Sequence, residues 1–117
     1  MSEFVAGQRD PEDEKLVVLA RSARARNGSA AGAAVRDTTG RTYVATTVEL
    51  ASLRLSAVQG AVAMAVSGGA EALETGVVVT DADLAEQDVA AARDLGAAQV
   101  LLVAPDGSTT AVVRPAE

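Results

Sequence analysis

The sequence contains no cysteine and no histidine. Without cysteine no disulfide bond can form, so cysteine usage gives no information about the redox state of the compartment. Neither a Ser-His-Asp nor a Cys-His catalytic arrangement can be assembled from the residues present. The thiolate and imidazole ligands that zinc prefers in proteins are absent as well. The sequence therefore predicts no zinc ion and no other cofactor.

Aromatic residues are also scarce, with one tyrosine, one phenylalanine and no tryptophan among 117 residues. Hydrophobic residues nevertheless make up 49% of the chain, which is typical of a folded domain rather than a disordered one. The core must be built from valine, leucine and alanine. The length predicts one domain over residues 11–117, preceded by a flexible leader over residues 1–10.

Positive charge is in the minority, because the formal net charge is -6. An acidic domain repels phosphate backbones, so nucleic acid is not an expected partner. Arg21, Arg24 and Arg26 form a local exception. On a helix these arginines are interpreted as a solvated face, and a phosphate-binding role is the alternative.

Long apolar runs are missing too. The first fifteen residues carry several acids and no apolar stretch, unlike a signal peptide. The longest uncharged run, residues 55–70, is too short to span a membrane. We therefore expect a cytoplasmic protein that does not engage a membrane.

Hydrophobic periodicity and turn signals predict an alternation of helices and strands. Helices are expected over residues 11–27, 49–67 and 82–95. Strands are expected over residues 30–36, 42–48, 76–80, 99–104 and 109–114.

Two local motifs accompany this order of elements. The first is Ala-Gly-Ala-Ala-Val at residues 31–35, followed by a turn and a strand, and the second is Thr-Val-Glu-Leu-Ala-Ser at residues 47–52. Both resemble the corresponding motifs of the cytidine deaminase family, and the likeness extends over residues 16–113. The resemblance implies a three-layer α/β/α fold in which helices flank a five-stranded mixed sheet.

The chemical positions of that family are changed in this sequence. The resemblance places Ser56 and Val58 where the family has its first zinc ligand and its catalytic glutamate. Glu86 and Val89 lie in the region that supplies the remaining ligands. These four residues are therefore interpreted as a degenerate zinc site. An acidic cluster nearby, Asp81, Asp83, Glu86 and Asp88, is interpreted as favouring the start of a helix rather than as a metal site.

The resemblance also implies a vestigial substrate site. Glu49 corresponds to a ribose-binding glutamate, Thr47 replaces a ribose-binding asparagine, and Ser29 stands where the family has a base-stacking phenylalanine. The alternative interpretation of Glu49 is a residue at the N-terminus of a helix, where an acid is favoured by the helix dipole.

These observations predict a non-catalytic relative of cytidine deaminases that acts as an oligomeric structural or regulatory module. A nucleoside-binding or nucleotide-binding protein that keeps part of the pocket is the second hypothesis. An enzyme with another mechanism is the third, and the sequence predicts that the chain is not an enzyme.

The expected helix over residues 49–67 is apolar on almost every face. One face can cover a sheet, and the other needs a different cover in so short a chain. Gly60 and Ala61 would let a neighbouring backbone approach closely. We therefore predict a homo-oligomer, either a dimer or a tetramer, with another protein as the alternative partner.

Overall fold

The N-terminal helix α1 (Pro11–Asn27) begins and ends where its sequence signals indicate, in a computed structural model that describes residues 9–117. The Asp10 side chain accepts a hydrogen bond from the Glu12 amide at 2.8 Å and so caps the first turn. Gly28 ends the helix with a φ of 59°, a conformation that glycine adopts without steric cost. The predicted leader lies almost entirely outside the described residues.

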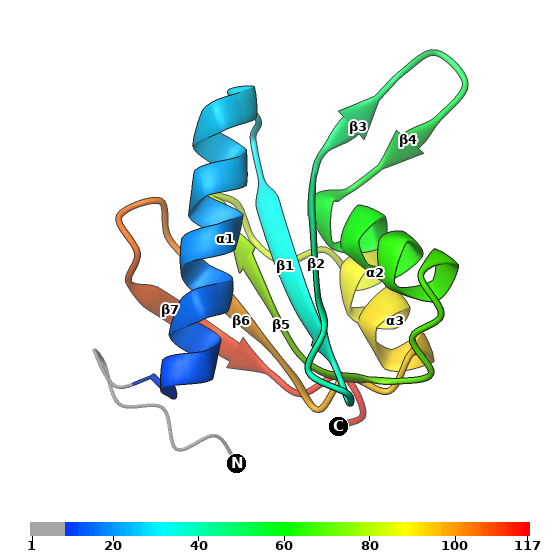
Figure 1. Ribbon diagram of the computed structural model, residues 1–117. Helices are drawn as coiled ribbons and strands as arrows, with labels where there is room; N and C mark the ends of the chain where they lie inside the picture. The colour runs from blue at the N-terminus through cyan, green and yellow to red at the C-terminus, as the bar shows by residue number, and fades with distance from the viewer. Residues whose placement is uncertain (1–8) are drawn as a thin grey trace.

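A mixed sheet forms the middle layer, with the strands in the spatial order β2, β1, β5, β6 and β7. The central strands β5 and β6 are parallel, whereas every other neighbouring pair is antiparallel. The five-stranded mixed sheet predicted from the sequence is therefore confirmed (Figure 1). The strands are β1 (Gly32–Asp37), β2 (Thr42–Thr46), β5 (Leu73–Val79), β6 (Gln99–Val103) and β7 (Thr109–Val113).

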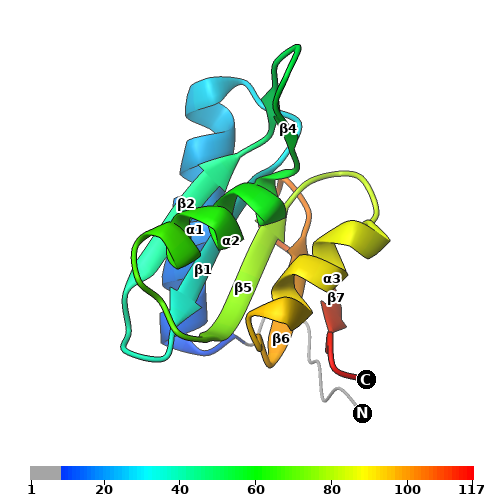
Figure 2. The same ribbon diagram turned by 90° about the vertical axis from the view of Figure 1, so that its right-hand side faces the viewer.

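Helices cover both faces of this sheet, which confirms the three-layer α/β/α architecture. Helix α1 packs on one face, and α2 (Ala57–Ser67) and α3 (Glu86–Asp94) pack on the other (Figure 2). Alternate strand residues point to opposite faces, so the two faces bury separate apolar clusters. The small side chains let the layers approach closely. At Gly32, a side chain would collide with the Ala20 carbonyl oxygen of α1.

The segment before α2 differs from the prediction. Instead of a helix from residue 49, it forms a short hairpin of β3 (Val48–Glu49) and β4 (Arg54–Leu55) that projects from the sheet (Figure 1). The Leu50 amide closes its turn by donating to the Leu53 carbonyl at 2.9 Å. The helix begins only at Ala57, because Ser56 provides the N-terminal cap. The interpretation of Glu49 as a helix N-terminal residue is therefore wrong.

Helix α3 also begins later than predicted, at Glu86 rather than near residue 82. The Thr80 hydroxyl accepts a hydrogen bond from the Ala82 amide at 3.2 Å and holds the chain in a turn directly after β5. Threonine side chains compete with helical hydrogen bonding in this way. The delayed start brings the first turn of α3 close to the start of α2.

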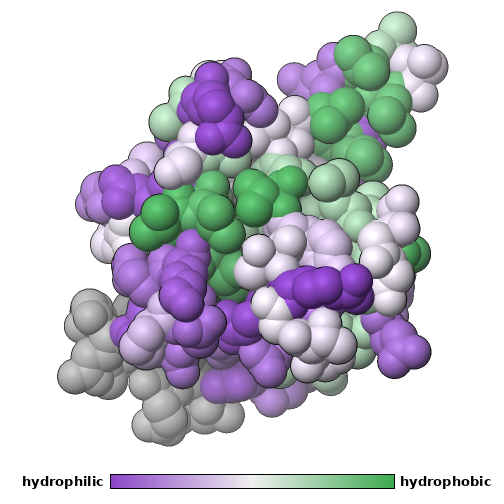
Figure 3. All heavy atoms as spheres, in the orientation of Figure 1, coloured by the Kyte–Doolittle hydropathy of each residue, from purple (hydrophilic) through white to green (hydrophobic). Residues whose placement is uncertain are grey.

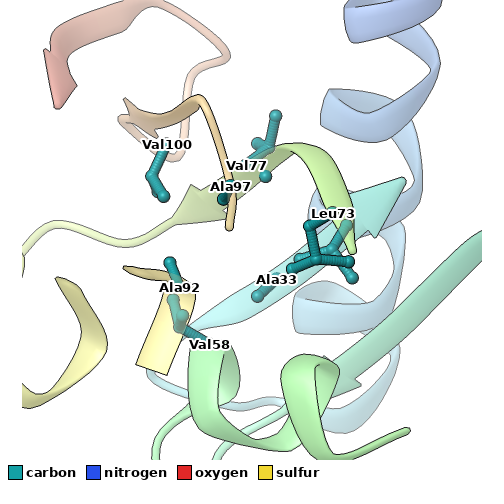
Figure 4. Close-up of a pocket in the computed structure, with 9 residues that line it drawn as sticks. Ala33, Val58, Leu73, Val77, Ala92, Ala97 and Val100 are labelled. Atoms are coloured by element: carbon teal, nitrogen blue, oxygen red, sulfur yellow. The ribbon is translucent and has the colours of Figure 1, made fainter. Parts of the chain in front are cut away.

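A narrow void remains between the sheet and the two helices α2 and α3. Its walls are entirely apolar, so it offers a water molecule no hydrogen-bond partner. Figure 4 shows Val58 of α2 beside Ala92 of α3, with the strand residues across from them. The lining residues are Ala33, Val35, Val58, Leu73, Gly76, Val77, Ala92, Ala97 and Val100.

Candidate nucleoside cleft

A cleft opens where the β3–β4 hairpin meets the N-termini of α2 and α3. It brings together three of the residues singled out in the sequence, namely Thr47, Glu49 and Ser56. Polar side chains predominate among the others. The full lining consists of Thr47, Val48, Glu49, Arg54, Leu55, Ser56, Gln59 and Gln87.

Ser56 lines this cleft and forms hydrogen bonds with both α2 and α3. Its hydroxyl oxygen accepts from the Gln59 amide at 3.0 Å, and the Gln59 side chain accepts from the Ser56 amide at 2.9 Å. This reciprocal pair is a capping box. The same hydroxyl donates to Oδ1 of Asp88 at 2.5 Å. Ser56 therefore both starts α2 and ties it to α3.

Asp88 is the site residue that the sequence analysis missed. It lies in the first turn of α3 and is 8% exposed, so its carboxylate is removed from water. A buried carboxylate needs hydrogen bonds to offset the loss of its hydration, and the Ser56 hydroxyl supplies one. The acidic cluster at residues 81–88 contained the signal, but nothing in the sequence distinguished the one acid that turns inward.

The other predicted positions do not gather around Ser56. Val58 is 3% exposed and points into the apolar void rather than the cleft (Figure 4). Glu86 is exposed and Val89 is half-buried, and neither lines the cleft. Ser29 also lies outside it, where its hydroxyl donates to the Ala31 carbonyl at 3.0 Å and accepts from the Thr47 amide at 3.3 Å. Ser29 thus positions the chain at Thr47.

The residues at this cleft do not fit a zinc ion. A zinc site in a protein needs at least three thiolate, imidazole or carboxylate ligands around one point. The chain has no cysteine or histidine, and residues 9–117 contain no group of three potential ligand side chains. Asp88 is the one carboxylate beside Ser56, and it is engaged by the serine hydroxyl.

A second polar cluster lies in the turn between β1 and β2 and has a structural role. Asp37 is 1% exposed. Burial alone would raise the pKa of Asp37, but hydrogen bonds from Thr39, Arg41 and Tyr43 outweigh it and hold that pKa well below its ordinary value of 3.8. The Asp37 carboxylate therefore fixes the hairpin and is fully occupied by its neighbours.

The fold and the cleft together define an α/β protein with a polar cleft at the N-termini of two helices. The profile described as cytidine deaminase-like matches residues 9–107. The chain belongs to the cytidine deaminase-like family. A search of curated proteins found no match.

Solved structures of cytidine deaminases share this fold. The enzyme from Burkholderia pseudomallei is 22% identical with a TM-score of 0.75, and the alignment covers 86% of this chain and 91% of that one. The Mycobacterium leprae enzyme is 22% identical with a TM-score of 0.69, over 92% and 96%. The Mycobacterium tuberculosis enzyme is 22% identical with a TM-score of 0.66, over 85% and 89%.

These neighbours correct one prediction. The sequence analysis predicted that the chain is not an enzyme, and that prediction is contradicted because the solved structures that match it are those of cytidine deaminases, which are enzymes. A separate finding concerns membranes. Within residues 9–117, none of the helices combines the length and the apolar character that a membrane crossing requires.

Proposed function

We propose that this chain is a nucleoside-binding, oligomeric member of the cytidine deaminase-like family. The observation that carries the proposal is the shared cleft of Thr47, Glu49 and Ser56. The resemblance had related Thr47 and Glu49 to ribose binding, and they line one wall together. Cytidine is the first nucleoside to test, because the solved structures that match the chain are named cytidine deaminases.

The chemistry of the cleft suits a ribose more than an isolated base. The exposed Glu49 carboxylate can accept hydrogen bonds from two vicinal hydroxyl groups. Gln87, which also lines the cleft, has an amide that can both donate to and accept from a nucleobase edge. Val48 and Leu55 are the apolar surfaces available to a ring. None of the lining residues, all within the described part of the chain, is aromatic.

Calorimetric titration with cytidine tests this proposal. We expect saturable binding, and a loss of about tenfold or more in affinity in Glu49→Gln, because a hydrogen bond to a charged group contributes about 1.5–3 kcal/mol. Glu71→Gln is the matched control, since Glu71 is exposed and does not line the cleft. Equal affinities in the two variants, or no heat with the unmodified protein, would refute nucleoside binding at Glu49.

The oligomer is proposed on a different observation. An apolar groove runs between β2, the β3–β4 hairpin and α2, where Met64 is 54% exposed. Leu50 and Leu53 at the hairpin tip are 59% and 49% exposed, and Figure 3 shows apolar atoms gathered on that hairpin. Contiguous apolar surface of this kind usually marks an interface. We propose a second copy of the chain as its cover, related by two-fold symmetry so that each hairpin meets the other copy's groove.

Of the small residues of α2 that the sequence suggested as the contact, Gly60 lines this groove and Ala61 does not. Gly60 and Ala61 are buried within the chain, and a side chain on Gly60 would lie 3.0 Å from the Ala45 Cβ. The test is therefore Met64→Lys, with Val18→Lys as the control because Val18 on α1 is also 54% exposed. Light scattering should show an oligomer that only Met64→Lys dissociates. A mass near 11.8 kDa for the unmodified protein would contradict the proposal.

A further inference from the structure

A second pocket lies on the other face of the sheet, between α1 and the loop that joins β6 to β7. Figure 1 shows that loop beside α1, and Arg21 links the two by donating from Nε to the Pro105 carbonyl at 3.2 Å. The polar lining is Arg21, Ser22 and Arg24, and apolar walls come from Val18, Val79 and Pro105. The pocket is an open hollow of about 330 Å³, at the lower end of the range for small-molecule sites.

The position of the pocket relative to the sheet is one where ligand binding is common. Val79 ends β5, and Pro105 follows closely after the end of β6. These are the two parallel strands, so the pocket lies beyond the carboxyl ends of a parallel pair. Open α/β sheets bind ligands in this position, because the helices and loops that follow parallel strands diverge there. The nucleoside cleft lies at the same edge of the sheet but on the opposite face.

The charge of the pocket is opposite to that of the protein. The chain has a net charge of -6, yet two of the residues that line the pocket are arginines. No lining residue within the described range 9–117 is acidic. Arg24 donates from Nε to the Ala30 carbonyl at 3.2 Å, as Arg21 does to Pro105. Both guanidinium groups are thus anchored at Nε, and within the described part of the chain their Nη atoms have no hydrogen-bond partner. Two anchored arginines with such Nη donors match the oxygens of a phosphate group.

One acid outside the lining moderates this field. Hydrogen bonds from Ser108, together with the charge of Arg21, lower the pKa of Asp106. The Asp106 carboxylate therefore stays ionised near Arg21 and offsets part of its charge.

We propose that this pocket binds the phosphate group of a small phosphorylated metabolite, with Arg21, Ser22 and Arg24 holding the phosphate oxygens and Val18 and Pro105 contacting the organic part. The site is independent of the nucleoside cleft. Its ligand class is a phosphate monoester rather than a nucleic acid, because the net charge of -6 on the chain repels a long phosphate backbone.

The experiment is an NMR titration of the full chain with inorganic phosphate and with a phosphate monoester that carries no nucleoside, such as phenyl phosphate, at constant ionic strength. Amide shifts should saturate and cluster around the pocket. Arg24→Gln should weaken phosphate binding by about tenfold or more, because it removes a charge-assisted hydrogen bond. Arg26→Gln is the matched control, since Arg26 lies on the same helix but not in the pocket. Asp106→Asn should tighten binding, an effect that a purely structural role would not produce.

If the phosphate monoester binds more tightly than inorganic phosphate, the apolar walls of the pocket contribute to binding. Shifts that do not saturate and that spread over the whole molecule would overturn the proposal. Such shifts would indicate a general salt effect of phosphate rather than binding at one site. Equal weakening by Arg24→Gln and Arg26→Gln would also overturn it. Loss of nucleoside binding at Glu49 would leave this site untouched, so the two proposals fail separately.

Discussion

Replacing Ser56 with alanine should destabilise the protein by more than the loss of a helix cap. Alanine removes the cap on α2, which contributes about 1 kcal/mol. It also removes the hydrogen bond to the Asp88 carboxylate, 8% exposed, and a hydrogen bond to a charged group contributes about 1.5–3 kcal/mol. The expected cost is therefore about 2.5–4 kcal/mol. A domain has only about 5–15 kcal/mol of stability in total, so the change is large.

Urea denaturation of a double-mutant cycle measures this effect. Asp88→Ala removes the carboxylate but keeps the cap, so its cost should be smaller, and the two substitutions should couple by about 1–2 kcal/mol. Ser67→Ala at the other end of α2 is the control, since the Ser67 hydroxyl has no partner among the described residues. A cost near 1 kcal/mol for Ser56→Ala with additive substitutions would refute the link between α2 and α3, because the cap alone would then account for it.

Three further results are expected. Gly76→Ala should raise the melting temperature by about 2–6 °C in calorimetry, because alanine restricts the unfolded chain. The Val35 side chain would lie 3.2 Å from the new Cβ and can move into the adjoining void. A lower melting temperature would show that Val35 cannot move. Asp37→Asn should make the free energy of unfolding depend less on pH below pH ~4. The lowered pKa of Asp37 means that its carboxylate contributes its full stabilisation above pH ~4 and loses it progressively below. An unchanged slope in acid denaturation would contradict this. Treatment with EDTA should leave both the melting temperature and cytidine binding unchanged, because the cleft lacks a zinc ligand set; a fall of several degrees would reveal a structural metal.

The sequence predicted the sheet and the first helix well because their signals are local. Asp10, Pro11 and Gly28 mark the ends of α1 through their own backbone preferences. The uninterrupted valines at residues 77–79 predict a strand covered on both faces, and helices cover it on both sides.

The start of α2 was missed although its signal is present. Ser56 and Gln59 have the spacing of a capping box, which indicates a start at residue 57. The apolar run extending back to residue 50 outweighed that signal in the sequence analysis. The leucines of that run instead form the exposed hairpin tip.

The link from Ser56 to Asp88 could not be predicted in the same way. The two residues are 32 positions apart, and their contact depends on how far α3 begins beyond β5. That distance is set by the turn at Thr80, whose side-chain hydrogen bond is visible only in the folded chain.

The central claim is that the cleft at the start of α2 binds a nucleoside, and an NMR titration with cytidine tests it most directly. We expect saturable shifts confined to the amides of the residues that line the cleft, namely residues 47–49, 54–56, 59 and 87. Shifts confined to the opposite face of the sheet around Arg21 and Arg24, or no saturable shift at millimolar cytidine, would contradict it.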